Sequence, residues 1–78
     1  MPTILRIEGY RFFFYSNELN EPAHIHVDHS GRSAKVWLDE VALAKNIGYN
    51  ARELRYILKL TADHQQTLLE AWNDYFGD

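Results

Sequence analysis

The hydrophobic pattern of this chain changes its period partway along, and that change constrains the fold more than any other feature. In short segments between residues 3 and 38, apolar side chains alternate with polar ones, as they do in β-strands. From residue 51 to residue 76 they recur every three or four residues, as on one face of a helix. Strands followed by a helical segment predict an α+β fold, and 78 residues suffice for a single domain spanning residues 1–78.

Four segments are predicted strands, the first two because they are rich in β-branched and aromatic residues and the last two because apolar and polar residues alternate. They are Thr3–Ile7, Tyr10–Tyr15, His24–Asp28 and Ser33–Leu38. Short turns between consecutive strands predict a small antiparallel sheet of about four strands. The second strand carries aromatic residues on both faces, so we expect it inside the sheet. The stretch Val41–Asn46 is ambiguous between a short strand and a helical turn.

The turn between the third and fourth strands predicts their register. Ser30-Gly31 is a two-residue hairpin signal, and such a turn pairs residues whose numbers sum to 61. The pairs toward the core are Ile25 with Val36 and Val27 with Ala34, and those on the other face are His26 with Lys35 and His24 with Trp37.

The C-terminal part of the chain predicts one long helix, Ala51–Phe76, packed on one face of the sheet. Asn50 is a favourable N-cap residue, and Glu53 three positions later completes a capping box. The apolar stripe of the helix is interrupted by the polar segment Thr61–Gln65. A kink at this segment, or two separate helices, is therefore the alternative.

Three residues are candidates for catalysis: His24, His26 and Lys35. Side chains two residues apart on a strand point the same way, so the two imidazoles share a face with Asp28. Histidine exchanges protons near neutral pH, and lysine stabilises a phosphoryl oxyanion. Such histidines and a lysine are the catalytic groups of a metal-independent ribonuclease.

Two other interpretations of the histidines stay open. A His-x-His pair suits a metal, but a site usually needs a third protein ligand, and no spacing selects one among Asp28, His29 and His64. Alternatively, both imidazoles are half-buried strand residues that bond to the backbone or pack on Trp37. The preceding loop, Asn17–Pro22, can bring further polar groups to the histidines. The chain has no cysteine, and we expect no cofactor.

The net charge of −3 is unevenly distributed, because every Lys and Arg lies before residue 60. An acidic total argues against a protein that coats nucleic acid, though it leaves room for a local basic site. Arg52, Arg55 and Lys59 form a basic surface in the first half of the predicted helix, where the helix dipole disfavours cations. We expect this surface to bind phosphate or a partner. A homodimer of antiparallel C-terminal helices and a simply solvated face are the alternatives.

No apolar run approaches the roughly 20 residues that span a membrane. The N-terminus lacks the pattern of a signal peptide. We therefore expect a cytoplasmic protein with no membrane partner.

Several segments of the chain are similar to one small bacterial family. The most specific is Glu21-Pro22-Ala23-His24-Ile25-His26-Val27. The others are Met1–Ile4, Phe14–Glu18, Ala34–Asp39, Ala51–Leu54 and Leu69–Phe76. Together they resemble domain-of-unknown-function family 4160, whose members often carry prolines where Ala23 and Glu40 stand here.

The resemblance implies a compact prokaryotic protein encoded beside a second small protein, in gene pairs that look like toxin–antitoxin modules. It supplies no reaction. The leading hypothesis is one half of such a pair, which binds the cognate small protein and has RNA as a candidate ligand or substrate, with Arg52 or Arg55 helping to hold the RNA backbone. The alternative is a non-catalytic interaction module, an antitoxin or adaptor, that works through its helix or a free sheet edge.

Overall fold

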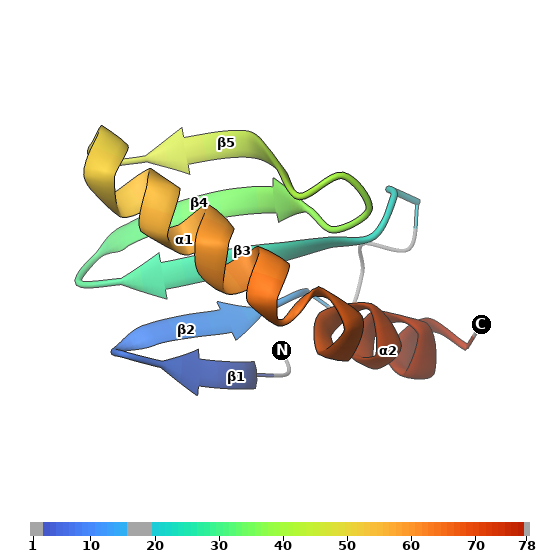
Figure 1. The fold of residues 1–78 in the computed structure, drawn as a ribbon. Helices are drawn as coiled ribbons and strands as arrows, with labels where there is room; N and C mark the ends of the chain where they lie inside the picture. The colour runs from blue at the N-terminus through green and yellow to red at the C-terminus, as the bar shows by residue number, and fades with distance from the viewer. Residues whose placement is uncertain (1–2, 16–19, 78) are drawn as a thin grey trace.

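The computed structural model describes residues 3–15 and 20–77, which form an antiparallel sheet of five strands followed by two helices (Figure 1). The strands lie in sequence order across the sheet. They are β1 (Thr3–Ile7), β2 (Tyr10–Phe13), β3 (His24–His29), β4 (Arg32–Trp37) and β5 (Ala42–Ile47). The helices are α1 (Ala51–Asp63) and α2 (Gln65–Phe76). The predicted α+β class is confirmed.

The hairpin of β3 and β4 has the predicted register, and all four predicted residue pairs occur. Its turn residues have positive φ angles, 51° at Ser30 and 80° at Gly31, as this kind of two-residue turn requires. Glu8 and Gly9, between β1 and β2, also have positive φ angles. β2 pairs with β1 and β3, so it lies inside the sheet as expected.

The sheet has a fifth strand, where the sequence predicted about four. The ambiguous stretch Val41–Asn46 contributes most of β5, which pairs with β4 with a register shift between Lys35 and Val36. Every residue of β5 after Ala42 is exposed. An edge strand without a buried face need not show apolar alternation, so pattern alone does not identify it.

One face of the sheet, which we call the helix face, packs against α1 (Figure 1). Apolar side chains alternate along β2, β3 and β4 and are buried on this face. They are Tyr10, Phe12, Ile25, Val27, Ala34 and Val36, and they share one core with Ile57, Leu60 and Leu68 of the helices. Within residues 3–15 and 20–77, neither helix has the length and hydrophobicity of a membrane span.

The C-terminal segment forms two helices, so the prediction of one continuous helix was wrong and its alternative was right. His64 leaves the helical conformation (φ −115°, ψ 17°), and its Nδ1 donates to the carbonyl of Leu60 at 2.9 Å. The Thr61 hydroxyl bonds back to the Ile57 carbonyl at 2.8 Å, a contact that often bends helices. The Gln65 amide donates to the Leu38 carbonyl at 2.6 Å. The polar segment thus turns the chain, and α2 crosses the end of the sheet (Figure 1).

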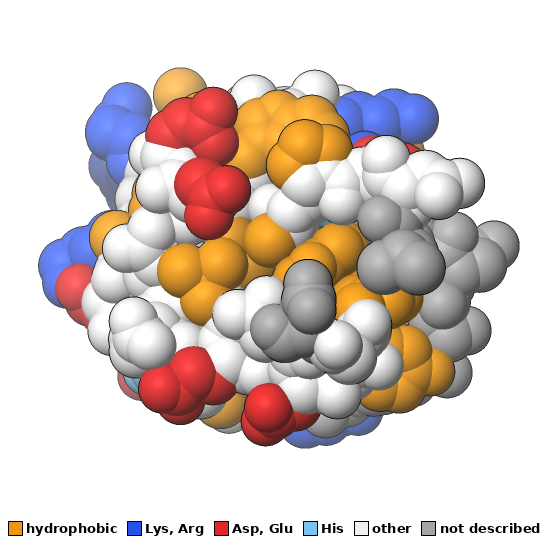
Figure 2. Space-filling view, turned by 90° about the vertical axis from the view of Figure 1, so that its right-hand side faces the viewer, with side chains coloured by type: hydrophobic (Ala, Val, Ile, Leu, Met, Phe, Trp, Pro, Cys, Tyr) orange, Lys and Arg blue, Asp and Glu red, His pale blue; other side chains and the backbone are white. Residues whose placement is uncertain are grey.

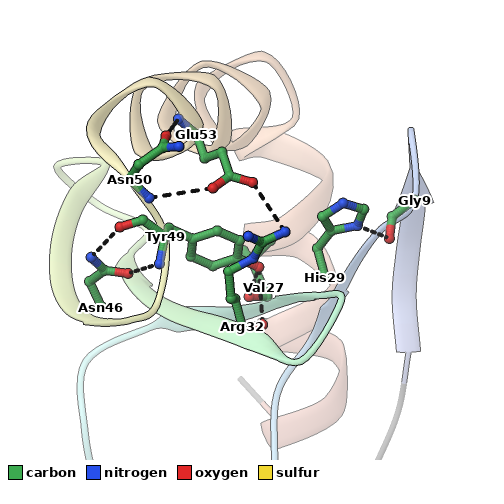
Figure 3. Close-up of polar contacts among 8 residues, drawn as sticks. All are labelled: Gly9, Val27, His29, Arg32, Asn46, Tyr49, Asn50 and Glu53. Carbon is green, nitrogen blue, oxygen red and sulfur yellow. Dashed lines mark hydrogen bonds and ion pairs between the residues drawn. The ribbon is translucent and has the colours of Figure 1, made fainter.

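A polar network holds the start of α1 against the sheet (Figure 3). The predicted capping box is confirmed: the Asn50 side chain accepts from the Glu53 backbone N–H at 2.9 Å, and the Glu53 carboxylate accepts from the Asn50 backbone N–H at 3.4 Å. The hydroxyl of Tyr49 lies 2.9 Å from the Val27 carbonyl and donates to it. Burial raises the pKa of Tyr49 to about 12. Arg32 reaches Glu53 at 3.5 Å, which joins the β3–β4 hairpin to the helix.

Candidate functional site

The face of the sheet turned away from α1 carries cations and aromatic rings in two adjacent rows, and we call it the open face. Residues directly opposite each other on neighbouring strands share a face of the sheet. The first row crosses the sheet as Phe13, His26, Lys35 and Lys45. The second row crosses it as Arg6, Arg11, Asp28, Ser33 and Ile47.

Each row contains two cations that lie directly opposite each other. Lys35 of β4 faces Lys45 of β5, and Arg6 of β1 faces Arg11 of β2. Like charges in directly opposite positions destabilise a sheet, by an amount of the order of 0.2–1 kcal/mol per pair. The fold itself therefore gains nothing from either pair. Asp28, directly opposite Arg11 on β3, and Glu21, which pairs with Lys35, offset part of this repulsion, and an anion bound between the two cations would offset the rest.

One member of each pair lies against an aromatic ring. The ammonium of Lys35 is 4.8 Å from the ring centre of Trp37, and the guanidinium of Arg11 is 4.4 Å from that of Phe13. Lys35 also pairs with the carboxylate of Glu21, from the segment before β3. The ring contacts hold these two cations in place, whereas Lys45 is exposed.

His26, Lys35 and Lys45 line a shallow pocket of about 190 Å³ on the open face. Its other lining residues are Tyr15, Ser33, Ala34 and Ile47. The volume is below the roughly 300 Å³ at which pockets for drug-sized ligands begin, so the pocket suits one phosphate group or one base. The ring of His26 stacks on Phe13, with centroids 5.4 Å apart, and meets the edge of Tyr15 at 4.8 Å.

His24 is enclosed, in contrast to His26, and its side chain is 0% exposed. Its Nδ1 donates to the Pro22 carbonyl at 2.9 Å, and its ring lies 5.7 Å from that of Trp37 and 5.0 Å from that of Trp72 in α2. The expectation that both histidines stand on an accessible face therefore fails at His24. The turn at His64 carries Trp72 to the end of the sheet, where it covers this imidazole. We keep His26 and Lys35 in the candidate site and assign His24 a packing role.

The structure does not bring the predicted basic surface of α1 to the candidate pocket. Arg52, Arg55 and Lys59 are exposed on α1, which covers the helix face, so the sheet separates them from His26 (Figure 1). Lys59 donates to Asp63 at 2.9 Å, and this hydrogen bond, together with the charge of Asp63, raises the pKa of Lys59. A phosphate in the pocket therefore has no contact with these residues.

Sequence reasoning missed three cations on the open face: Lys45, which lines the pocket, and Arg6 and Arg11, which lie on β1 and β2. Assigning β5 as a strand would have placed Lys45 opposite Lys35. The two-residue turn at Glu8-Gly9 would have placed Arg6 opposite Arg11 by the same arithmetic that was applied to the β3–β4 hairpin.

The described residues hold no group of three or more His, Asp or Glu side chains that could bind a metal ion. Of the third ligands considered, His29 bonds to the Gly9 carbonyl at 3.1 Å, and His64 bonds within α1. Asn17 and Glu18 of the candidate loop lie outside the described residues. Glu21, from the same loop, contacts Lys35.

The end of the molecule formed by α2 has a different surface. Figure 2 looks at this end and shows acidic side chains around apolar ones, with Lys and Arg side chains at the margins. Glu70 and Asp74 of α2 are exposed, and α2 contains no Lys or Arg. Part of the acidic charge of the chain is thus carried on α2, apart from the cation pairs of the open face.

An antiparallel sheet with α1 on one face, α2 across one end and cations on the other face defines an α+β protein with one accessible sheet surface. The family model described as a domain of unknown function, DUF4160, matches residues 9–73, and the chain belongs to this family. The predicted resemblance is confirmed. No curated protein and no solved structure matches the chain.

Proposed function

We propose that this protein binds single-stranded RNA on the open face of its sheet, as one half of a toxin–antitoxin-like pair in the bacterial cytoplasm. The proposal rests on one observation: two pairs of like-charged residues, Lys35 with Lys45 and Arg6 with Arg11, occupy directly opposite positions on the open face. Membership of the DUF4160 family supports the toxin–antitoxin part of the proposal only because the resemblance to this family implies genes that occur in such pairs.

The arrangement of the open face suits a single strand of nucleic acid. Proteins that bind single strands combine cations, which hold the phosphates, with aromatic side chains, on which the bases stack. Here the two cation pairs lie in adjacent rows, and Tyr15 and His26 stand beside the lysine pair. The midpoints of the two pairs are three strand spacings apart, roughly 14 Å across the sheet. Phosphates of one strand that are two or more nucleotides apart can reach the two pairs, while a base lies against the aromatic side chains.

The charge of the open face is local, which favours a short strand over a long duplex. Its four cations are opposed by the carboxylates of Asp28 and Glu21, and the chain as a whole has a net charge of −3. A protein that coats duplex nucleic acid needs a broad basic surface. Two cation pairs instead hold two phosphates.

Cleavage of the bound strand is the second candidate function, because a histidine lies beside two lysines in the pocket. His26 would take a proton from the attacking 2′-hydroxyl, and Lys35 and Lys45 would stabilise the charged phosphoryl oxygens. The two-histidine arrangement considered from the sequence is not available, since His24 is enclosed. The bond from phosphorus to the leaving 5′-oxygen then breaks, and solvent water supplies the proton that this oxygen takes up.

A titration of fluorescently labelled single-stranded RNA with the purified protein tests the proposal. We expect saturable binding that weakens with salt. The slope of log K against log salt should be about −1.4 to −2.8, as expected for two to four phosphate contacts on a single strand. A matched duplex should bind more weakly. Absence of saturable binding at low salt, or binding that salt does not change, would contradict the proposal.

The same samples distinguish binding from cleavage. Shortened RNA that appears with the wild type and disappears in His26→Ala would support the nuclease version. Intact RNA in all samples would mean that the protein binds RNA but does not cleave it. Arg55→Ala, on α1, is the matched control and should bind and process the RNA as the wild type does.

A further inference from the structure

β5 is the least covered strand of the sheet. Within residues 3–15 and 20–77 it pairs only with β4, so the backbone groups on its outer side have no strand partner there. Its position at the upper edge is visible in Figure 1. An exposed strand edge of this kind can accept an extended segment of another chain.

The side chains of β5 are also unusual for a strand on the surface. The exposed large apolar residues of the described chain are three tyrosines and two aliphatic residues, and both aliphatic residues, Leu43 and Ile47, lie on β5. Their exposed fractions are 38% and 54%. Lys45 stands between them in the sequence and faces Lys35 across the strand pair. It shares the open face with Ile47, which lies opposite Ser33, whereas Leu43 lies opposite Val36 on the helix face. The edge thus offers apolar contacts and a cation together.

We propose that β5 is a docking edge for an extended, acidic segment of a partner protein, which joins the sheet as a further strand. Its backbone bonds to the free edge, and its apolar side chains cover Leu43 on the helix face. A carboxylate beside Lys45 replaces the repulsion from Lys35 with attraction. The chemistry of the occupant is therefore an alternation of apolar and acidic residues.

A second copy of this chain does not fit the same edge. An antiparallel pairing of two β5 strands centred on this lysine puts Lys45 opposite Lys45. Lysine on an edge strand is a common protection against pairing of identical strands. Lys45 therefore disfavours self-association and selects an acidic strand.

Docking at β5 has a consequence for RNA. Lys45 belongs to the edge strand and also lines the pocket with His26 and Lys35. A partner carboxylate at Lys45 takes the place of a phosphate, so the partner strand and RNA exclude each other. This competition rests on the proposed function, whereas the docking itself does not.

The test uses a labelled synthetic peptide in which valine and glutamate alternate, titrated with the full chain. We expect saturable binding, about tenfold weaker for Lys45→Glu because an attraction becomes a repulsion. A peptide of alternating valine and lysine should not bind. The valine–glutamate peptide with methylated backbone amides should not bind either, because it lacks the N–H groups that pair with a strand. Arg55→Glu, an equal charge change on α1, is the control and should leave the affinity unchanged.

The proposal is overturned if the acidic peptide does not saturate, or if it binds equally well after Lys45→Glu or after methylation. Circular dichroism of both variants confirms that they fold. Adding the peptide to the protein–RNA complex then separates the two claims. Release of the RNA supports the competition, and RNA that stays bound beside the peptide overturns it. Absence of RNA binding without peptide overturns the proposed function, while peptide binding still supports the docking edge.

Discussion

Replacing both Lys35 and Lys45 by glutamate will weaken binding of single-stranded RNA by at least about a hundredfold at constant salt. The change converts the two cations of the pocket into two anions, which repel the phosphate that they are proposed to hold. Fluorescence anisotropy of labelled RNA measures the affinity. The double variant Arg52→Glu, Arg55→Glu on α1 changes the net charge equally and should lose no more than about threefold.

The single variant Lys45→Glu sharpens this test, since it should change stability and affinity in opposite directions. It removes the repulsion from Lys35, which should raise the free energy of unfolding by a few tenths of a kcal/mol up to about 1 kcal/mol. It should also weaken RNA binding. Equal losses of affinity in the pocket and α1 double variants would mean that only net charge matters, and would exclude the open face as the binding surface.

The second large effect concerns stability: Trp72→Ala should lower the free energy of unfolding by about 3–5 kcal/mol. Trp72 is 7% exposed and lies 5.3 Å from Phe14, 4.3 Å from Phe76 and 5.0 Å from His24 between ring centroids. Its removal leaves a cavity between α2 and the sheet. Thermal unfolding followed by circular dichroism measures the loss.

A loss of that size is a large part of the total stability of a small domain, typically about 5–15 kcal/mol. Asn73→Ala, an exposed position in the same helix, is the matched control and should change stability by less than about 0.5 kcal/mol. A melting temperature of Trp72→Ala within a few degrees of the wild type would show that α2 does not close the end of the sheet. His24 would then be accessible, and its exclusion from the candidate site would be wrong.

The features that could be predicted from the sequence are those set by neighbouring residues. The register of β3 and β4 follows from the Ser30-Gly31 turn, because a two-residue hairpin fixes every pair beyond it. The capping box of α1 follows from Asn50 and Glu53 in the same way. The register of this two-residue hairpin also predicted the pairing of His26 with Lys35, which places both residues in one pocket.

The features that could not be predicted depend on contacts between distant segments. The burial of His24 requires Trp72, 48 positions along the chain, and depends on the turn at His64. The strand β5 has an exposed surface, so the alternation that marks a half-buried strand is missing from it. Because β5 was not assigned, the cation pair that it forms with β4 was missed too. The sequence thus predicted that His26 and Lys35 stand side by side, but it did not predict that His24 is enclosed.

The most direct test of the account is a titration of the isotope-labelled protein with single-stranded RNA, followed through the backbone amide resonances in NMR spectra. The account predicts the largest shifts on the sheet, around Arg6, Arg11, His26, Lys35 and Lys45, with the amides of Arg52 and Arg55 unchanged. Shifts concentrated on α1, with the resonances of β4 and β5 unmoved, would contradict it.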